Sequence, residues 1–343
     1  MSGWKTCNYS RGEIDRAGQV LRGKLTHENF SQYIDAYSVM DNWRASHSFP
    51  LNTIQMSLRR RSKNVDRSAD IVQRLKRAPS VISKLRRYDG MLLSRMQDLG
   101  GCRAILGGVA DVYSVREQYR KSRDRHDLAT EKDYIAEPQS SGYRGIHLIY
   151  KYRSDRSNAY NDHRIEIQLR SRIQHAWATA VEIAGVYVRT PLKSSIGPTE
   201  WLDFFKFASS AFSILENTPR VHQSESEAEI IKSLKDIDKR IDARNKLSSF
   251  NSAHDYIAQS RRKSDTHFIL TLDLSEQKTF IEAFDNFSIA TSRYSDLEKK
   301  YIDNAMVDVV LVAAENIESA THAYPNYFVD TTEFIQILDG VLS

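Results

Sequence analysis

Residues 163–170, HRIEIQLR, alternate strictly between apolar and polar side chains, and this alternation constrains the fold more than any other stretch. The apolar positions are Ile165, Ile167 and Leu169, and the polar positions are Glu166, Gln168 and Arg170. Side chains that alternate with period two lie on opposite faces of a strand. The stretch therefore predicts a half-buried strand whose second face carries an acid, an amide and a guanidinium, with His175 just beyond.

The surrounding segment predicts a mixed α/β region. Residues 142–153, GYRGIHLIYKYR, predict a second strand, and the polar loop 154–162 between the two strands is a hairpin signal. Residues 102–109 predict a further strand, and residues 172–186 predict a helix. The expected fold class is α/β, with a mixed sheet flanked by helices.

The first hundred residues predict helices. Ser10 and Glu13 have the spacing of a capping box, and residues 54–77 continue the helical style. Pro79 interrupts the pattern. We expect Ser80 to cap the next helix and Gly90 to end it.

Three domains are expected. Residues 1–195 form the first, with the N-terminal helices and the mixed sheet. Residues 196–264 form a helical connector. Residues 265–343 form a small acidic α/β domain with the order β-β-α-β-α, in which residues 267–274 and 278–284 pair as a hairpin and residues 306–314 form a buried strand.

Composition limits the possible functions. No apolar run approaches the roughly 20 residues of a membrane span, and the N-terminus has no secretion-type apolar segment. The two cysteines, Cys7 and Cys102, lack the spacing of a zinc site, so a cytoplasmic protein without disulfides is expected.

Residues 51–100 carry a net charge of +8, whereas residues 265–343 carry −10. A basic segment suits phosphate-bearing partners, although a solvated helix face is the ordinary alternative.

The basic segment contains a candidate polyphosphate clamp. Its members are Arg74, Lys76, Ser80 and Lys84. Ser80 and Lys84 are four residues apart, on one side of a helix, and helix N-termini attract anions. Spacing alone favours the solvated-surface interpretation, because charge runs usually face water.

Two acids are candidate metal ligands. Asp98 precedes two glycines and a strand, and Glu166 lies on the polar face of another strand. Two carboxylates can hold Mg²⁺ together with substrate phosphates, and Arg170 can stabilise charge on a transferred phosphoryl group. Tyr143, after a glycine, can present its ring for stacking on a base. A turn aspartate and a core-covering loop tyrosine are the commoner alternatives for Asp98 and Tyr143. No P-loop, kinase glycine-rich loop or HExxH motif is present.

Four separated blocks, taken in order, resemble the RelA/SpoT family of pyrophosphokinases. They are RLKRAPSVISK, MQDLGGCRAIL, KDYIAEPQSSGYRGIH and IEIQLRSRIQHAWATAVE, within about residues 40–190. The resemblance implies a nucleotidyltransferase-like synthetase domain that uses Mg²⁺ to move the β,γ-pyrophosphate of ATP onto a 3′-hydroxyl, leaving AMP. The family's usual acceptor is GDP or GTP, which gives (p)ppGpp, whereas toxin-like members modify the 3′ end of tRNA.

The resemblance also implies roles for individual residues. The residues for ATP binding are Arg74, Lys76, Ser80 and Lys84. The acids for Mg²⁺ and for activating the hydroxyl are Asp98 and Glu166. The remaining catalytic residues are Arg103, Gln168 and Arg170. The residues for acceptor binding are Lys132, Tyr143, His147 and His175.

The sequence departs from the family at the acceptor loop. Typical members carry a Lys and an Asn just before the Gly-Tyr pair, and here these positions are Gln139 and Ser141. No HDxxED hydrolase motif is present. We therefore expect a stand-alone synthetase without a hydrolase, acting on GDP or GTP, with two alternatives: a tRNA-modifying toxin, and a catalytically silent nucleotide-sensing module. A protein regulator acting through residues 265–343 is a further expectation, and the sequence leaves the oligomeric state open.

Overall fold

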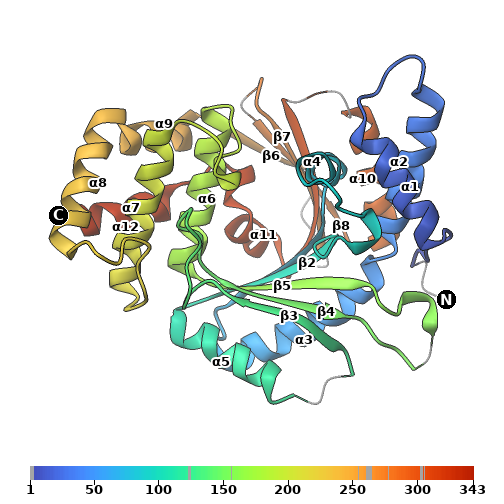
Figure 1. Ribbon diagram of the computed structural model, residues 1–343, viewed down its shortest axis with the longest axis horizontal. Helices are drawn as coiled ribbons and strands as arrows, with labels where there is room; N and C mark the ends of the chain where they lie inside the picture. Colours follow the sequence, from blue (N-terminus) through green and yellow to red (C-terminus); the bar gives the residue numbers. More distant parts are fainter. Residues whose placement is uncertain are drawn as a thin grey trace.

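Helices and strands of the whole chain are arranged around one twisted sheet (Figure 1). A computed structural model describes residues 4–122, 125–155, 157–253, 255–259, 265–276, 278–301, 304 and 306–343. The helices are α1 (Arg11–Arg22), α2 (Phe30–Ala45), α3 (Ser48–Val65), α4 (Ala78–Arg87), α5 (Val109–Arg120), α6 (Arg172–Tyr187), α7 (Thr199–Leu215), α8 (Glu227–Ile241), α9 (Ala243–Ala253), α10 (Phe287–Lys300), α11 (Ile317–Ala323) and α12 (Thr332–Leu342). The strands are β1 (Asp70–Leu75), β2 (Gly100–Leu106), β3 (Asp127–Asp133), β4 (Ile146–Lys151), β5 (Arg164–Ser171), β6 (Asp255–Gln259), β7 (His267–Asp273), β8 (Lys278–Phe284) and β9 (Val307–Ala313). Short 3₁₀ turns lie at Leu93–Arg95, Asn158–Tyr160, Leu192–Ser194 and Pro325–Tyr327.

The sheet has nine strands in the order β3-β4-β5-β2-β1-β9-β7-β8-β6. Strands β2 and β5 are parallel, as are β6 and β8, and the other neighbours are antiparallel. The expected mixed sheet flanked by helices is confirmed, and so are the β4–β5 and β7–β8 hairpins.

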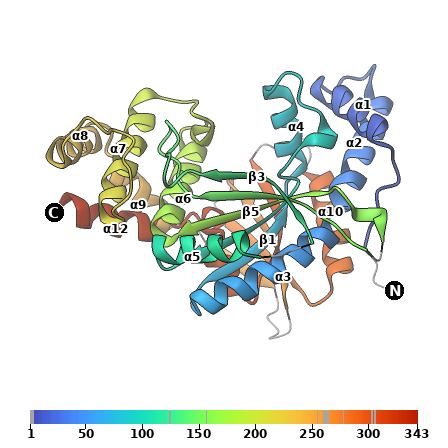
Figure 2. The ribbon, with the colours of Figure 1, turned by 60° about the horizontal axis from the view of Figure 1, so that its bottom comes forward.

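The apolar face of β5 packs into the core beneath the sheet. Ile165, Ile167 and Leu169 are each 0% exposed, and they share a cluster with Leu58 of α3 and Val112 of α5. Burying such a side chain contributes about 1.5–3 kcal/mol. Figure 2 shows α3 and α5 on this side of the sheet, with α1, α2 and α4 on the other. The opposite, polar face of β5 is therefore free to form a site.

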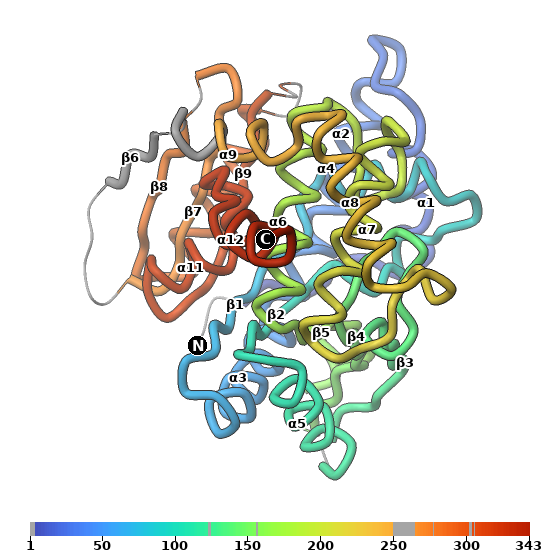
Figure 3. The backbone as a smooth tube through the Cα atoms, turned by 90° about the vertical axis from the view of Figure 1, so that its left-hand side faces the viewer, coloured from blue at the N-terminus to red at the C-terminus, as the bar shows by residue number. Residues whose placement is uncertain are grey.

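A second core joins the connector helices to the end of the chain. Phe204, Phe205 and Phe212 of α7 pack against Phe334 and Leu338 of α12. Figure 3 views this end of the molecule, where α6, α7, α8 and α12 gather. Among the described helices, none has the length and apolar character that crossing a bilayer requires.

The prediction of a helix through residues 54–77 is wrong at its end. Helix α3 ends at Val65, and residues 70–75 form β1, which lies between β2 and β9 in the sheet and has buried apolar side chains. Helix α4 begins at Ala78 with Arg77 as its N-cap, so Ser80 lies inside the first turn rather than at the cap. The capping box of Ser10 is confirmed.

Residues 265–343 have the expected β-β-α-β-α order, but their strands do not form a sheet of their own. Strand β9 pairs with β1 through Gln73–Ala313 and Arg74–Val312, so the C-terminal strands extend the sheet of the first half. The expected domain boundaries stay predictions, and residues 260–264, before the last boundary, lie outside the described residues.

Candidate active site

The polar face of β5 forms the floor of the candidate site. Gln168 lies opposite Arg103 of β2 and opposite His147 of β4. Directly paired residues project to the same face of a sheet, and so do residues two apart on one strand, which adds Glu166 and Arg170. The structure thus brings these five predicted residues together on one surface.

Glu166 is held by two neighbours. Its Oε1 lies 2.9 Å from His147 Nδ1, and its Oε2 accepts a hydrogen bond from Gln168 Nε2 at 2.8 Å. Burial would raise the pKa of Glu166, but the His147 contacts, Gln168 and the charge of Lys76 outweigh burial and lower the pKa to about 2. Glu166 is therefore ionised throughout the neutral range.

Tyr143 ends a chain of polar contacts that begins at Glu166. Its hydroxyl lies 2.5 Å from His147 Nε2 and accepts a hydrogen bond from Arg170 Nη2 at 2.9 Å. Burial would raise the pKa of Tyr143, but the charges of Arg170 and His147 outweigh it and lower the pKa. Burial would lower the pKa of His147, but Tyr143 and Glu166 raise it. The chain Glu166–His147–Tyr143 therefore links the floor of the site to the acceptor loop.

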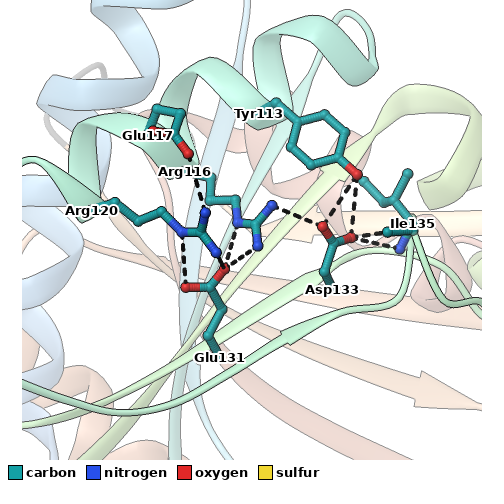
Figure 4. Close-up of polar contacts among 8 residues, drawn as sticks. Tyr113, Arg116, Glu117, Arg120, Glu131, Asp133 and Ile135 are labelled. Atoms are coloured by element: carbon teal, nitrogen blue, oxygen red, sulfur yellow. Dashed lines mark hydrogen bonds and ion pairs between the residues drawn. The ribbon is translucent and has the colours of Figure 1, made fainter.

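A network of ion pairs fixes the strand that leads into the acceptor loop (Figure 4). Asp133, at the end of β3, accepts hydrogen bonds from the backbone N–H groups of Ile135 and Ala136, each at 3.0 Å. Arg116 of α5 pairs with Asp133 at 2.9 Å and also with Glu131. The same strand carries Lys132, which pairs with His147 across the sheet but is exposed.

The predicted ATP residues line one large cavity of about 740 Å³. Strand β1 and the segment after it supply Arg74 and Lys76, and α4 supplies Ser80 and Lys84. Asp98 also lines the cavity, just ahead of β2. The four predicted phosphate ligands and one predicted acid are therefore in one place.

Asp98 is clamped between two lysines. Lys76 Nζ lies 3.0 Å from Oδ2, and Lys84 Nζ lies 2.9 Å from Oδ1. Burial would raise the pKa of Asp98, but the two ammonium charges outweigh burial and lower it, while the charge of Glu166 acts in the opposite sense. The Asp98 and Glu166 carboxylates thus influence one another across the site.

The C-terminal segment, residues 265–343, contacts the same polar face of the sheet. Arg103 Nη1 donates to the carbonyl of Ala323 at 3.2 Å, and the guanidinium groups of Arg103 and Arg74 lie 5.8 and 5.7 Å from the Tyr324 ring. Burial and the charge of Arg170 lower the pKa of Arg103 to about 10, so it stays charged at neutral pH. The C-terminal segment therefore holds one of the predicted catalytic arginines.

His175 also faces the C-terminal segment. The ring is buried, with Nε2 3.1 Å from the carbonyl oxygen of His322. Burial and the charge of Arg103 hold its pKa well below the usual range, so the ring is neutral at neutral pH.

Sequence reasoning missed three residues that line the cavity, and a fourth, Glu298, at the start of the helix that borders it. Asp308 and Tyr327 line it from the C-terminal segment, and Asp308 forms an ion pair with Arg77. Glu182 lines it from α6, where burial would raise its pKa but Lys193 and Arg74 lower it below the usual range. Glu298 accepts from the backbone N–H of Ala78. Glu182 belongs to a block that resembles the family, whereas nothing in the sequence places the others near Arg74.

Asp98 and Glu166 fit a Mg²⁺ site that a bound nucleotide completes with its phosphates. No group of three His, Cys, Asp or Glu side chains is arranged for a metal ion in the part of the chain that the structure describes. Mg²⁺ is commonly held by one or two carboxylates plus substrate phosphates, and Asp98 and Glu166 provide those carboxylates beside a cationic cavity.

Comparison with known proteins identifies the central region. The family model "Region found in RelA / SpoT proteins" matches residues 73–189. The chain is 32% identical over 111 residues to the GTP pyrophosphokinase YjbM of Bacillus subtilis. The matched residues cover 32% of this chain and 52% of that protein. It is 25% identical over 159 residues to the GTP pyrophosphokinase YwaC of Bacillus subtilis, covering 42% and 75%.

Part of the chain is also similar to solved structures. The small alarmone synthetase 1 from Bacillus subtilis superposes with a TM-score of 0.44 at 25% identity, over 52% of this chain and 92% of that one. Among the curated relatives, the chain spans about half the length of YjbM, the first that it matches.

Proposed function

Residues 73–189 are a RelA/SpoT-family domain, and from this premise we propose that the protein transfers the β,γ-pyrophosphate of ATP to the 3′-hydroxyl of GDP or GTP, making (p)ppGpp. One observation supports this most: the 740 Å³ cavity lined by Arg74, Lys76 and Lys84 also contains Asp98. Cations for a polyphosphate thus lie beside an acid that is kept ionised.

On the donor side, the chain binds and neutralises phosphates. Arg74, Lys76 and Lys84 contact the phosphate oxygens of ATP, and Ser80 adds a hydroxyl in the first turn of α4. Charge-assisted contacts of this kind are about twice as strong as neutral hydrogen bonds. When ATP binds, its phosphates compete with Asp98 for Lys76 and Lys84. Mg²⁺, when bound with ATP at Asp98 and Glu166, supplies positive charge that offsets the charge of the phosphates.

On the acceptor side, the chain orients a hydroxyl. Tyr143 stacks on the base, with Lys132 and His175 among the acceptor-binding residues, and Glu166 accepts a hydrogen bond from the 3′-hydroxyl. The 3′-oxygen forms a bond to the β-phosphorus while the bond between that phosphorus and the α,β-bridging oxygen breaks. AMP leaves with this oxygen, and the hydroxyl proton passes to Glu166 and then to solvent. Arg103, Gln168 and Arg170 stabilise the charge that develops.

The test is direct transfer from labelled ATP. ATP labelled at the β- or γ-phosphate is incubated with GDP, with GTP or with tRNA, and the products are separated by thin-layer chromatography. We expect the label in a guanine nucleotide, with Mg²⁺ required and with no transfer by Asp98→Asn. Absence of label from every acceptor would refute the proposal.

A tRNA acceptor is the second candidate. It is favoured by the neutral acceptor loop, where Gln139 and Ser141 replace the cationic pattern of guanine-nucleotide enzymes. Label in tRNA that disappears when its 3′ end is trimmed would favour this candidate.

The retention of both Asp98 and Glu166 argues against a catalytically silent sensor. A cytoplasmic location is a further expectation, which cell fractionation tests.

We also propose that residues 265–343 restrain the enzyme or receive a protein regulator that does. Asp308 pairs with Arg77, and Tyr324 lies against both Arg74 and Arg103. These contacts compete with a nucleotide for the same cations. In the full chain, Asp308→Asn should raise transfer and make it less sensitive to salt, because screening weakens the wild-type ion pair. Equal rates and equal salt responses in both proteins would exclude restraint through this contact.

A further inference from the structure

Helix α7 holds the acceptor loop in place. Ser209 Oγ donates to the carbonyl oxygen of Gly142 at 2.6 Å and accepts from Arg144 Nε at 3.0 Å. Both Ser209 and Arg144 are buried. Gly142 has a φ of +94°, and a Cβ there would lie 2.9 Å from Ser209 Cβ and 3.0 Å from Trp177 Cζ2. Only glycine permits this close approach, so the loop that carries Tyr143 is docked directly on α7.

A cavity of about 190 Å³ lies between the loop and this helix. Its walls are mainly apolar and include Tyr143, Trp177 and Phe205, while Lys193 and Lys206 stand among its lining residues. Aromatic walls with cations beside them suit a nucleobase that carries a phosphate.

The small cavity adjoins the ATP cavity. Val181, Leu192 and Lys193 line both of them. An acceptor seated in the small cavity therefore lies next to the donor, as a direct transfer requires.

We infer that α7, which lies outside the matched residues 73–189, sets acceptor choice through Lys206, which lines the same small cavity as the proposed base-stacking Tyr143. This rests on the proposed transfer reaction. Lys206 contacts the acceptor phosphate and supplies positive charge that the loop lacks at Gln139. Among the described residues, the ion pair of Lys206 is with the partly exposed Asp203, at 3.4 Å, and an exposed pair of this kind contributes little to stability.

The first test changes Lys206 in the full chain. Kd for labelled GDP and for a short RNA with a free 3′ end is measured by equilibrium dialysis, and KM is measured for acceptor and ATP separately. Lys206→Gln should raise the Kd and KM of the acceptor roughly tenfold and leave the KM of ATP unchanged. Lys232→Gln is the matched control, because Lys232 is exposed on α8 and lines neither cavity.

A second pair of variants tests the docking of the loop. Ser209→Ala should raise the KM of the acceptor without changing the KM of ATP. Ser213→Ala should change neither, because Ser213 is also buried in α7 but its Oγ donates to Ser210 within the helix. A general loss of folding would lower the maximal rate and leave both KM values unchanged, so a raised KM of the acceptor alone separates positioning from stability.

The outcomes separate the two acceptor sources and the two proposals. An effect of Lys206→Gln on GDP alone supports a free nucleotide in the cavity, and an effect on RNA alone supports an RNA 3′ end. Lys206→Gln behaving like Lys232→Gln, or a wild type that binds neither acceptor, overturns the inference. If the wild type binds an acceptor but transfers nothing, the reaction proposal fails, while the dialysis comparison still tests the cavity.

Discussion

The backbone N–H of Ala78 donates to Oε1 of Glu298 across 3.2 Å, which places an acid of α10 at the N-terminus of α4. The same carboxylate forms an ion pair with the buried Arg44, and the Tyr294 hydroxyl donates to it at 2.7 Å. A helix N-terminus stabilises negative charge, so Glu298 satisfies an orphan donor and a buried guanidinium together. Two segments far apart in sequence are joined at this one carboxylate.

Removing Glu298 should destabilise the whole chain. Glu298→Ala removes the buried carboxylate partner of Arg44 and leaves only the partly exposed Asp41 beside it, and breaking a buried ion pair typically costs about 3–5 kcal/mol. Urea denaturation followed by circular dichroism measures the free energy of unfolding. Lys299→Ala, at the exposed neighbouring position, is the control and should change it by less than about 0.5 kcal/mol. A loss in Glu298→Ala no larger than in the control would contradict a structural role for this pair.

Neutralising either acid should abolish transfer. Asp98→Asn leaves Lys76 and Lys84 without their counter-charge, and Glu166→Gln removes the carboxylate that His147 and Gln168 hold. Losing a group of this kind costs orders of magnitude in rate. Rates are measured with labelled ATP, and circular dichroism checks that each variant is folded. Wild-type turnover in a folded variant would remove that acid from the active site.

Weakening the cationic cavity should weaken ATP binding. Arg74→Ala and Lys84→Ala each remove a phosphate contact, which is expected to cost about 1.5–3 kcal/mol of binding free energy. Isothermal titration with a non-hydrolysable ATP analogue gives the Kd, and the exposed Lys121→Ala is the control. If both cavity variants bind as tightly as the control, residues 74–84 are a solvated surface and not a clamp.

Two substitutions at Tyr143 should separate its ring from its hydroxyl. Tyr143→Ala removes a stacking platform worth about 1–3 kcal/mol per base and should raise the KM of the acceptor. Tyr143→Phe keeps the ring but loses the contacts with His147 and Arg170, so it should lower kcat with little change in KM. Steady-state kinetics with the acceptor varied gives both constants. Identical effects of the two changes would mean that the ring does not stack.

Acid should destabilise the fold through a buried histidine pair. His47 and His163 pack with ring centroids 4.5 Å apart, and burial lowers the pKa of His163 to about 4. The folded state therefore keeps His163 neutral, whereas the unfolded chain gains a proton below about pH 6.5. This stability is fully present above pH 6.5 and is lost as the pH falls toward 4, reaching a loss of about 2 kcal/mol at pH 5. Urea denaturation at both ends of this range should show a smaller pH dependence for His163→Gln. An equal dependence would place the acid sensitivity elsewhere.

The sequence alone was sufficient where the physics is local. The alternation of residues 163–170 predicted β5 (Arg164–Ser171) and its polar floor, because successive side chains of a strand point to opposite faces. Lys84 was expected on a helix and Glu166 on a strand, and both expectations are confirmed, whereas Arg74 was expected on a helix and lies on β1.

Contacts between distant segments could not be predicted in this way. Residues 70–75 form a strand rather than the predicted helix because their backbone pairs with β2 and β9, and the short apolar pattern alone does not show this pairing. The hydrogen bonds from Arg103 to the carbonyl of Ala323 and from the backbone N–H of Ala78 to Glu298 each join residues separated by 220 positions. The sequence around Ala323 and Glu298 has no local pattern that predicts such a partner.

The pairing of β1 with β9 also has a consequence for the newborn chain. Arg74 pairs with Val312, so the outer edge of β1 stays open at least until Val312 has been translated. Ribosomes add roughly 5–20 residues per second, which leaves this edge unpaired for on the order of ten seconds. Open edges pair readily with other chains, so neighbouring nascent copies on one messenger RNA are exposed to one another during that interval. Any restraint exerted by β9 and α11 is therefore made later than the elements that carry the predicted site residues.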